Sequence, residues 1–376
     1  MFHPNQILSA SNIRNAFLSG TRFALLSALC QSGKTGTFQS LIQQMLVAGD
    51  VSHAYILCGS SETQLRQQSV DDTKTANSAN FGRIKILFHQ DFSDATLDVK
   101  NALFVLDESH MVQTKGQQLH QFLLKYGITL DGNPEPLEKN NSYFLSVDAT
   151  PYSELAALYN EETLYPKYVE QLKPGNGYYG LADYARDELL FPTFSIHADS
   201  KRFEDLLLSV GQKYVILRLN RSEKNIDNEA ELKNLCRKHN FPVCYYTHER
   251  RDVAMTKQEQ KRAARGGLRI PCLDDQPATT TVVIIRGRLR AGKVVPKKHV
   301  SFIWEGASKS KTDALVQGLV GRMCGYAFGK VKPKLFVPVT ALVPTEFGRV
   351  LKDELPKTST NMRADQMTNG KSVFST

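Results

Sequence analysis

The sequence lacks several features that define large classes of protein. It has no run of 18 consecutive apolar residues, which excludes a membrane-spanning helix at the sequence level. Its six cysteines form no CxxC pair and no zinc-type Cys/His spacing, so we expect neither a disulfide framework nor a structural zinc site. The opening segment, MFHPNQILSASNIRN, does not have the basic stretch followed by an apolar stretch that is typical of a signal peptide. We therefore expect an intracellular protein that is not secreted.

Acidic residues are few in the second half of the chain. The whole sequence has 47 Lys and Arg against 38 Asp and Glu, a net charge of +9. Residues 1–165 hold 11 basic and 16 acidic residues, a balance of −5, which leaves 36 basic and 22 acidic residues, or +14, for residues 166–376. A basic half favours a polyanionic partner, although a well-solvated surface has the same composition.

The order of apolar runs predicts an α/β protein. At 376 residues the chain exceeds one ordinary core, and two to three domains are expected. Strand-like runs alternate with helical stretches, the pattern of mostly parallel sheets with flanking helices. We expect strands at 23–30, 53–59, 83–89, 102–108 and 142–151, then at 213–219, 241–247, 281–287, 299–305 and 334–340. The predicted parts are a first domain at 1–165, a connector at 166–210, a second domain at 211–350 and a C-terminal tail at 351–376.

A short polar turn between the first strand and the first amphipathic helix predicts a phosphate-binding loop. The turn has the sequence QSGKTG, and the full pattern of such loops would place Gly where this chain has Ala28. Its amides would hold the phosphates of ATP, Lys34 would add a point charge, and the Thr35 hydroxyl would bind Mg²⁺. The predicted ATP-binding residues of this loop are Gln31, Ser32, Gly33, Lys34, Thr35 and Gly36.

Two adjacent carboxylates end the fourth apolar strand. Asp107 and Glu108 follow the run LFVL, about 70 residues after the phosphate loop. An Asp here can hold Mg²⁺ and a neighbouring Glu can activate water, whereas an acidic helix cap would serve structure alone. Both motifs in one α/β domain, in this order, favour a catalytic pair over a cap.

These motifs resemble those of superfamily 2 helicases and translocases over nearly the whole chain. QSGKT resembles motif I, DESH is a variant of motif II, and Asp148-Ala149-Thr150-Pro151 resembles motif III with Asp148 in place of the usual Ser. The resemblance implies two tandem RecA-like domains, with Lys34 and Glu108 as catalytic residues. It also implies that Gln6, 27 residues before Gly33, reads the adenine edge.

Further motifs of the resemblance concern nucleic acid and the second domain. Gly59, Ser60 and Ser61 are similar to motif Ia and would contact the strand backbone, although any one Ser could be an ordinary helix cap. The stretch RGRLRAGK at 286–293 resembles motif V. It implies that Arg288 and Lys293 contact nucleic acid and that Arg290 contacts nucleotide, whereas the alternative is a basic surface turn. Gln317 and Arg322 resemble motif VI, and Arg322 would reach the γ-phosphate as an arginine finger, with helix capping as the alternative.

The resulting hypothesis is an ATP-dependent helicase or translocase that uses Mg²⁺. Its partner would be nucleic acid, held through phosphates, with DNA slightly favoured over RNA. Three alternatives stay open. The chain could be a P-loop ATPase that remodels protein, a decayed fold without activity, or a motor subunit of a larger assembly that does not unwind strands itself.

Overall fold

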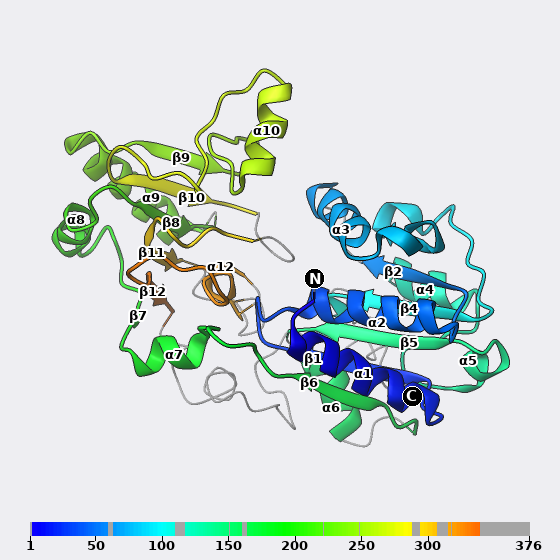
Figure 1. Cartoon of the computed structure of the whole chain (residues 1–376). Helices are drawn as coiled ribbons and strands as arrows, with labels where there is room; N and C mark the ends of the chain where they lie inside the picture. Colours follow the sequence, from blue (N-terminus) through cyan, green and yellow to red (C-terminus); the bar gives the residue numbers. More distant parts are fainter. Residues whose placement is uncertain are drawn as a thin grey trace. The chain divides into compact units, whose positions relative to one another are not determined.

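The chain divides into two compact units. The computed structural model describes residues 2–58, 63–109, 117–149, 151–159, 164–220, 222–247, 249–287, 294–306, 315–316 and 318–338. Among the described residues, those up to Tyr178 form the first unit and those from Tyr179 onward form the second. Each is built on one six-stranded sheet (Figure 1).

The sheet of the first unit has the strand order β3-β2-β4-β5-β1-β6, and every pairing in it is parallel. Every residue of the strands β1 and β5 is buried, as the apolar runs predict for strands covered on both faces. The strands are β1 (Phe23–Ala28), β2 (His53–Cys58), β3 (Ile84–Phe88), β4 (Ala102–Asp107), β5 (Tyr143–Asp148) and β6 (Tyr168–Leu172).

Helices cover both faces of this sheet. Ile13, Phe17 and Leu41 bring α1 and α2 into one apolar cluster with alternate strand residues, and Phe122 and Leu137 bring α4 and α5 into a second cluster on the other face. The two clusters take opposite sets of strand residues because successive side chains of a strand point to opposite faces. The helices are α1 (Pro4–Leu18), α2 (Lys34–Ala48), α3 (Thr63–Ala76), α4 (Gln118–Leu124), α5 (Glu135–Lys139) and α6 (Tyr152–Tyr159), with 3-10 turns η1 (Ser78–Arg83) and η2 (His89–Asp91).

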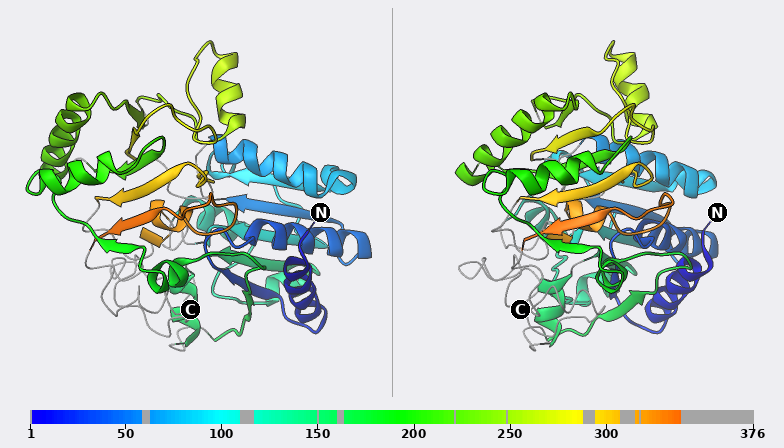
Figure 2. Two further views of the ribbon diagram at one scale, coloured as in Figure 1. Left: turned by 60° about the vertical axis from the view of Figure 1, so that its left-hand side comes forward. Right: turned by 90° about the vertical axis from the view of Figure 1, so that its left-hand side faces the viewer.

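The sheet of the second unit has the order β7-β12-β11-β8-β10-β9 and is also parallel throughout. Its strands are β7 (Leu190–Pro192), β8 (Tyr214–Arg218), β9 (Val243–Tyr246), β10 (Thr281–Ile285), β11 (Val300–Glu305) and β12 (Lys334–Val337). The described helices are α7 (Leu181–Arg186), α8 (Ser200–Leu208), α9 (Glu223–Lys238), α10 (Lys257–Arg265) and α12 (Leu319–Arg322). Helices α8 and α9 pack on one face of this sheet, over a core that includes Trp304 (Figure 2).

The predicted fold class is confirmed. Two parallel sheets with flanking helices are present, and ten of the strands, β1 to β5 and β8 to β12, overlap the ten expected ones. The predicted connector, 166–210, contains additional structure, because β6 extends the first sheet while β7 and α8 belong to the second unit. Both additional strands are short edge strands near Pro and Gly, so they lack the long apolar run that marks a central strand.

An insertion between β9 and β10 was not expected from the sequence. It holds α10, whose N-terminus is capped by the Thr256 side chain accepting a hydrogen bond from the Glu259 amide at 3.3 Å. Ala254, Ile270 and Cys272 form a small core of their own beneath it. Ala263 of α10 packs against this small core, in the segment that follows β9.

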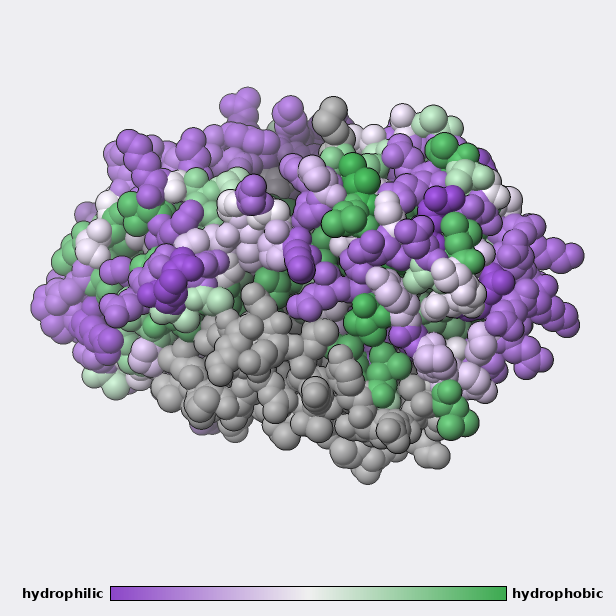
Figure 3. Space-filling view, turned by 60° about the horizontal axis from the view of Figure 1, so that its bottom comes forward, coloured by the Kyte–Doolittle hydropathy of each residue, from purple (hydrophilic) through white to green (hydrophobic). Residues whose placement is uncertain are grey.

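The face drawn in Figure 3 is mainly hydrophilic. Hydrophilic residues occupy most of the coloured area in Figure 3, and apolar residues form small separate groups between them. None of the helices in the described ranges has the length and apolar content that a membrane crossing needs.

Candidate nucleotide site

The predicted phosphate loop lies between β1 and α2, at the carboxyl edge of the first sheet. Gly33 has φ +117°, and α2 begins at the next residue, Lys34. The free amides and positive dipole end of a helix are directed at any anion bound here. Ser32 is buried and donates from Oγ to the Leu29 carbonyl oxygen at 2.8 Å, while Thr35 is exposed in the first turn of α2.

Gln6 of α1 closes against this loop. Its Nε2 donates to the Gly33 carbonyl oxygen at 3.2 Å, and its Oε1 accepts from the His3 amide at 2.9 Å. A β-carbon at Gly33 or at Gly36 would lie 2.5 or 2.4 Å from the Gln6 Nε2 atom, far inside van der Waals contact. The loop therefore needs glycine at both positions while Gln6 is in place. The adenine-reading role predicted for Gln6 stays a prediction.

The second predicted motif reaches the same place. Asp107 is the last residue of β4, and Glu108 lies at φ +59° in the left-handed region, which is uncommon for a residue other than Gly. The Lys34 Nζ and Glu108 Oε1 atoms are 3.5 Å apart, with both side chains largely buried. Gln31 also has a positive φ, of 61°, so two residues with unusual backbone conformations flank one ion pair. Residues with such strained backbone conformations are typically found together at functional sites.

Asp148 adds a third carboxyl group, which the sequence analysis placed in motif III but did not assign to the site. It ends β5, which lies beside both β1 and β4, so parallel topology brings its carboxyl group to the same edge. It is completely buried, and the Ser109 hydroxyl donates to its Oδ2 at 3.1 Å. Ser109 of DESH and Asp148 of DATP are therefore hydrogen-bonded to each other. Both residues depart from the usual motifs, and these two departures are the sequence signal that could have indicated the contact.

Electrostatics at this edge are dominated by the carboxyl groups. Burial lowers the pKa of Lys34, but the charges of Glu108, Asp148 and Asp107 outweigh burial and leave the pKa raised. Burial and the nearby Glu108 raise the pKa of Asp107 to about 7, against the opposing effect of Lys34. Lys34 therefore stays charged. Three carboxyl groups, those of Asp107, Glu108 and Asp148, lie around this one ammonium group.

This composition fits a nucleotide with a divalent cation. The amide end of α2 and the Lys34 ammonium would bind phosphate, and a divalent cation held by Asp107 would offset the negative charge of the carboxyl groups. No group of three His, Cys, Asp or Glu side chains in the described ranges could hold a metal ion by itself. Mg²⁺ in nucleotide sites uses only one or two carboxylates together with phosphates and water, so the arrangement agrees with that chemistry.

Tyr178 was also missed by the sequence analysis. Its hydroxyl donates to the Cys30 carbonyl oxygen at 2.8 Å, directly before the phosphate loop. The residue lies in a stretch with no clear period, and only the fold brings it beside the loop.

In the second unit, the predicted finger residue Arg322 is the last residue of α12. It is 6% exposed, and its Nε has no hydrogen-bond acceptor among the described residues. Arg286, which opens the predicted motif V, is instead ion-paired with Glu229. A buried N–H group without an acceptor, such as the Arg322 Nε–H, costs free energy unless another group accepts from it.

Lys297 is a second buried cation of this unit, and the sequence analysis did not identify it. It is 5% exposed, and its Nζ lies 5.3 Å from the centroid of the Phe328 ring. Burial, together with the charge of Arg322, lowers the pKa of Lys297 to about 8, while Cys324 opposes this change. The residue sits within KVVPKKH, which resembles a basic turn and gives no sign of burial.

The remaining predicted site residues lie outside the described residues. These are three residues of motif Ia, three of motif V and one of motif VI: Gly59, Ser60, Ser61, Arg288, Arg290, Lys293 and Gln317. The structure therefore brings Gln6, the loop, Asp107 and Glu108 together in the first unit, and places Arg322 in the second.

No protein-family model matches the chain. The uncharacterized protein L594 of Acanthamoeba polyphaga mimivirus is 25% identical over 239 residues, which are 60% of this chain and 53% of that protein. The chain thus spans about half the length of that curated relative.

Solved helicase structures share the fold. The S. cerevisiae Dbp5 variant bound to RNA and ADP BeF3 aligns with a TM-score of 0.50 at 13% identity, over 98% of this chain and 96% of that one. This chain shares the fold of these solved helicases. The Mycobacterium smegmatis helicase Lhr, bound to ssDNA and AMP-PNP, aligns at 0.51 and 12%, over 94% of this chain and 49% of that one. The DUF1998 helicase MrfA, bound to DNA, aligns at 0.51 and 13%, over 98% and 53%. At these identities the likeness establishes the helicase fold, with its two RecA-like domains, and leaves the activity to the site.

Proposed function

We propose that the protein is an ATP-hydrolysing motor of the helicase or translocase type that acts on nucleic acid. The observation that carries the proposal is the convergence of Gly33, Lys34, Asp107 and Glu108 at one sheet edge, with Lys34 and Glu108 3.5 Å apart. The helicase fold supports it, as do two structural neighbours that hold nucleotide analogues, ADP BeF3 and AMP-PNP.

The chain's own residues supply the chemistry of hydrolysis. Lys34 and the loop amides bind and orient the β- and γ-phosphates, and Thr35 with Asp107 would hold Mg²⁺. When bound, Mg²⁺ neutralises charge on the phosphate oxygens. Glu108 orients the attacking water and accepts its proton.

Arg322 of the second unit is proposed as the finger that stabilises charge on the γ-phosphate. The residue is buried and its Nε lacks an acceptor among the described residues, so a phosphate oxygen would complete the hydrogen bonding of this N–H group. Gln317 and Arg290 would assist on the nucleotide side. Arg322 and the phosphate loop belong to different units. Hydrolysis would therefore require a movement of one unit relative to the other, and this coupling is the basis of a motor step.

Nucleic acid is the proposed partner. The structural neighbours were solved with RNA, with ssDNA and with DNA, and the +14 charge of residues 166–376 agrees with a polyanion. The proposed contacts are Gly59, Ser60, Ser61, Arg288 and Lys293 on the strand backbone, with DNA slightly favoured over RNA. Recognition would be largely independent of sequence.

The test is ATP turnover by the full chain with single- and double-stranded DNA and RNA, each at low and moderate salt. We expect stimulation, with a log–log salt slope of affinity of roughly −0.9 per duplex phosphate or −0.7 per single-strand phosphate neutralised. Turnover without stimulation by any of the four would instead indicate the protein-remodelling ATPase. No turnover under any condition would remove the enzyme assignment.

A further inference from the structure

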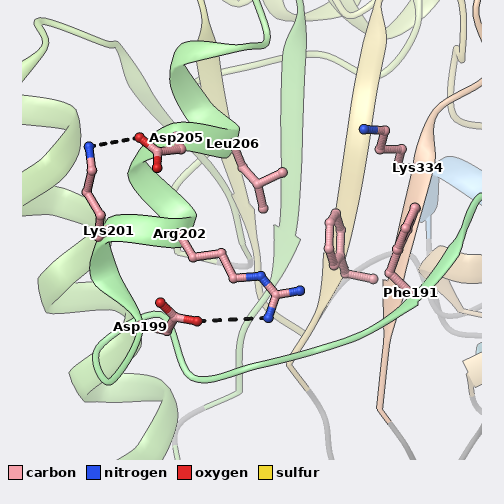
Figure 4. Close-up of a pocket in the computed structure, with 8 residues that line it drawn as sticks. Phe191, Asp199, Lys201, Arg202, Asp205, Leu206 and Lys334 are labelled. Carbon is pink, nitrogen blue, oxygen red and sulfur yellow. Dashed lines mark ion pairs between the residues drawn. The ribbon is translucent and has the colours of Figure 1, made fainter.

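A cavity of about 560 Å³ opens on the α8 face of the second unit, at the edge of its sheet. Phe191 of the edge strand β7 and Phe336 of β12 are register partners, and their rings stack with centroids 5.2 Å apart. Leu206 of α8 completes the apolar lining (Figure 4). We refer to this cavity as the aromatic pocket. Its volume is in the range of pockets that hold a small ligand or a large side chain.

The aromatic pocket lies away from the edge that would carry the motor residues. Lys334, which also lines it, is the first residue of β12 and therefore marks the amino edge of the parallel sheet. Arg286 and Gly287 follow the carboxyl end of β10 at the opposite edge. An occupant of the pocket would leave that carboxyl edge free.

Two cations at the pocket differ in how far they are already paired. The Arg202 guanidinium lies 4.0 Å from the Phe194 ring centroid and forms an ion pair with Asp199 at 3.9 Å, a separation too long for a hydrogen bond. Lys334 is exposed and forms no ion pair with any described residue, while its Nζ lies 5.9 Å from the Phe191 ring centroid. In Figure 4 a dashed line joins the Arg202 guanidinium to Asp199, and the guanidinium extends from α8 toward the side of the pocket where Phe191 lies.

The third cation is already neutralised. Lys201 is paired with Asp205 at 2.8 Å and with Glu204 at 3.6 Å. The pocket therefore combines an apolar floor with the Lys334 ammonium, which has no ion pair among the described residues, and with Arg202, whose ion pair with Asp199 is too long for a hydrogen bond. Asp199 and Asp205 at the rim repel any anion, and the repulsion grows with its charge, so they disfavour a chain of phosphates more than one or two carboxylates placed beside Arg202 and Lys334.

We propose that the aromatic pocket docks a partner protein through a short peptide segment in which an aromatic or large aliphatic residue is flanked by Asp or Glu. The apolar side chain packs on Phe191, Phe336 and Leu206. The flanking carboxylates bind the planar fork of Arg202 and the Lys334 ammonium. The proposal does not depend on the motor function, because no residue of the pocket belongs to the nucleotide site.

The test uses fluorescently labelled eight-residue peptides with the central sequence Asp-X-Glu, where X is Phe, Tyr, Trp, Leu or Met, titrated with the full chain. We expect saturable binding of at least one peptide, and a loss of at least tenfold in affinity in Arg202→Glu and in Lys334→Glu. The matched control is Lys224→Glu, an exposed cation on α9 outside the pocket, which should bind as the unmodified chain does. Peptides with X as Ala, or with Lys in place of both acids, should not bind.

Several results would overturn the proposal. They are no saturable binding by any of the five peptides, equal binding by the two pocket variants and Lys224→Glu, or a single-stranded oligonucleotide binding the pocket in place of the peptides. Basal ATP turnover, measured on the same variants, should be unchanged. Failure of the motor assignment would appear there, separately from the peptide titration.

Discussion

Replacing Lys297 by Met tests the electrostatics of the second unit most quantitatively. The lysine is 5% exposed, and burial together with Arg322 lowers its pKa to about 8, from the ordinary 10.5. The folded unit therefore releases this proton more readily than the unfolded chain. The folded unit is less stable at every pH at which the buried ammonium stays charged. Met has nearly the same size as Lys but carries no charge.

The expected magnitude follows from the shift. A difference of one pKa unit corresponds to about 1.36 kcal/mol, so the charged lysine costs the folded state about 3 kcal/mol below pH 8. The cost decreases as the pH rises from 8 toward 10.5, because the folded state is then deprotonated while the unfolded chain still binds the proton. Lys297→Met should thus stabilise the unit by about 3 kcal/mol at pH 7 and by about 1 kcal/mol at pH 9.5.

Urea unfolding monitored by tryptophan fluorescence measures this effect in the right unit. The chain has one tryptophan, Trp304, which is 1% exposed in the core of the second unit. The control is Lys298→Met, an exposed neighbour that should change stability little. A Lys297→Met variant that is destabilised at pH 7, or whose gain does not decrease by pH 9.5, would refute the reasoning.

Three further predictions concern the nucleotide site. Lys34→Ala should abolish hydrolysis and weaken nucleotide binding, because the triphosphate loses its point charge; normal turnover would remove Lys34 from the site. Gly36→Ala should displace the Gln6 amide, whose Nε2 would be 2.4 Å from the new β-carbon, and lose about 1 kcal/mol with its hydrogen bond; a double-mutant cycle with Gln6→Ala in chemical denaturation should be strongly non-additive, and simple additivity would contradict the contact. Arg322→Ala should leave ATP binding nearly intact but reduce stimulated turnover by about 10³, with no rescue by Lys; full stimulated activity with a stability loss under ~1 kcal/mol would reduce Arg322 to a helix cap.

The central strands and the phosphate loop could be predicted from the sequence because their signals are local. A strand covered on both faces is a continuous apolar run, as FALLSA of β1 is, and the loop that follows it is a contiguous motif. The carboxyl ends of parallel strands lie at one edge of a sheet. Asp107 at the end of β4 therefore lies at the same edge as Lys34, which follows β1.

The rest depends on contacts that the sequence does not encode locally. β6 pairs with β1 across more than a hundred residues, and its five residues include only two that are buried. Lys297 is buried by residues such as Phe328, which lie later in the chain, so its own neighbourhood indicates only a basic turn. The aromatic pocket likewise joins β7, α8 and β12, three elements whose separate sequences carry no pocket motif.

The most direct measurement for the central claim is steady-state ATP turnover and ATP affinity of Glu108→Gln beside Glu138→Gln, an exposed glutamate of α5. The amide keeps the shape of Glu108 but cannot accept the proton of water, and Asp107 still offers a carboxylate to Mg²⁺. We predict that Glu108→Gln binds ATP with Mg²⁺ as tightly as the unmodified chain and hydrolyses it at least about 10²-fold more slowly with or without nucleic acid, while Glu138→Gln is unaffected. Near-normal turnover by Glu108→Gln would contradict the account and leave DESH as the cap of a strand end.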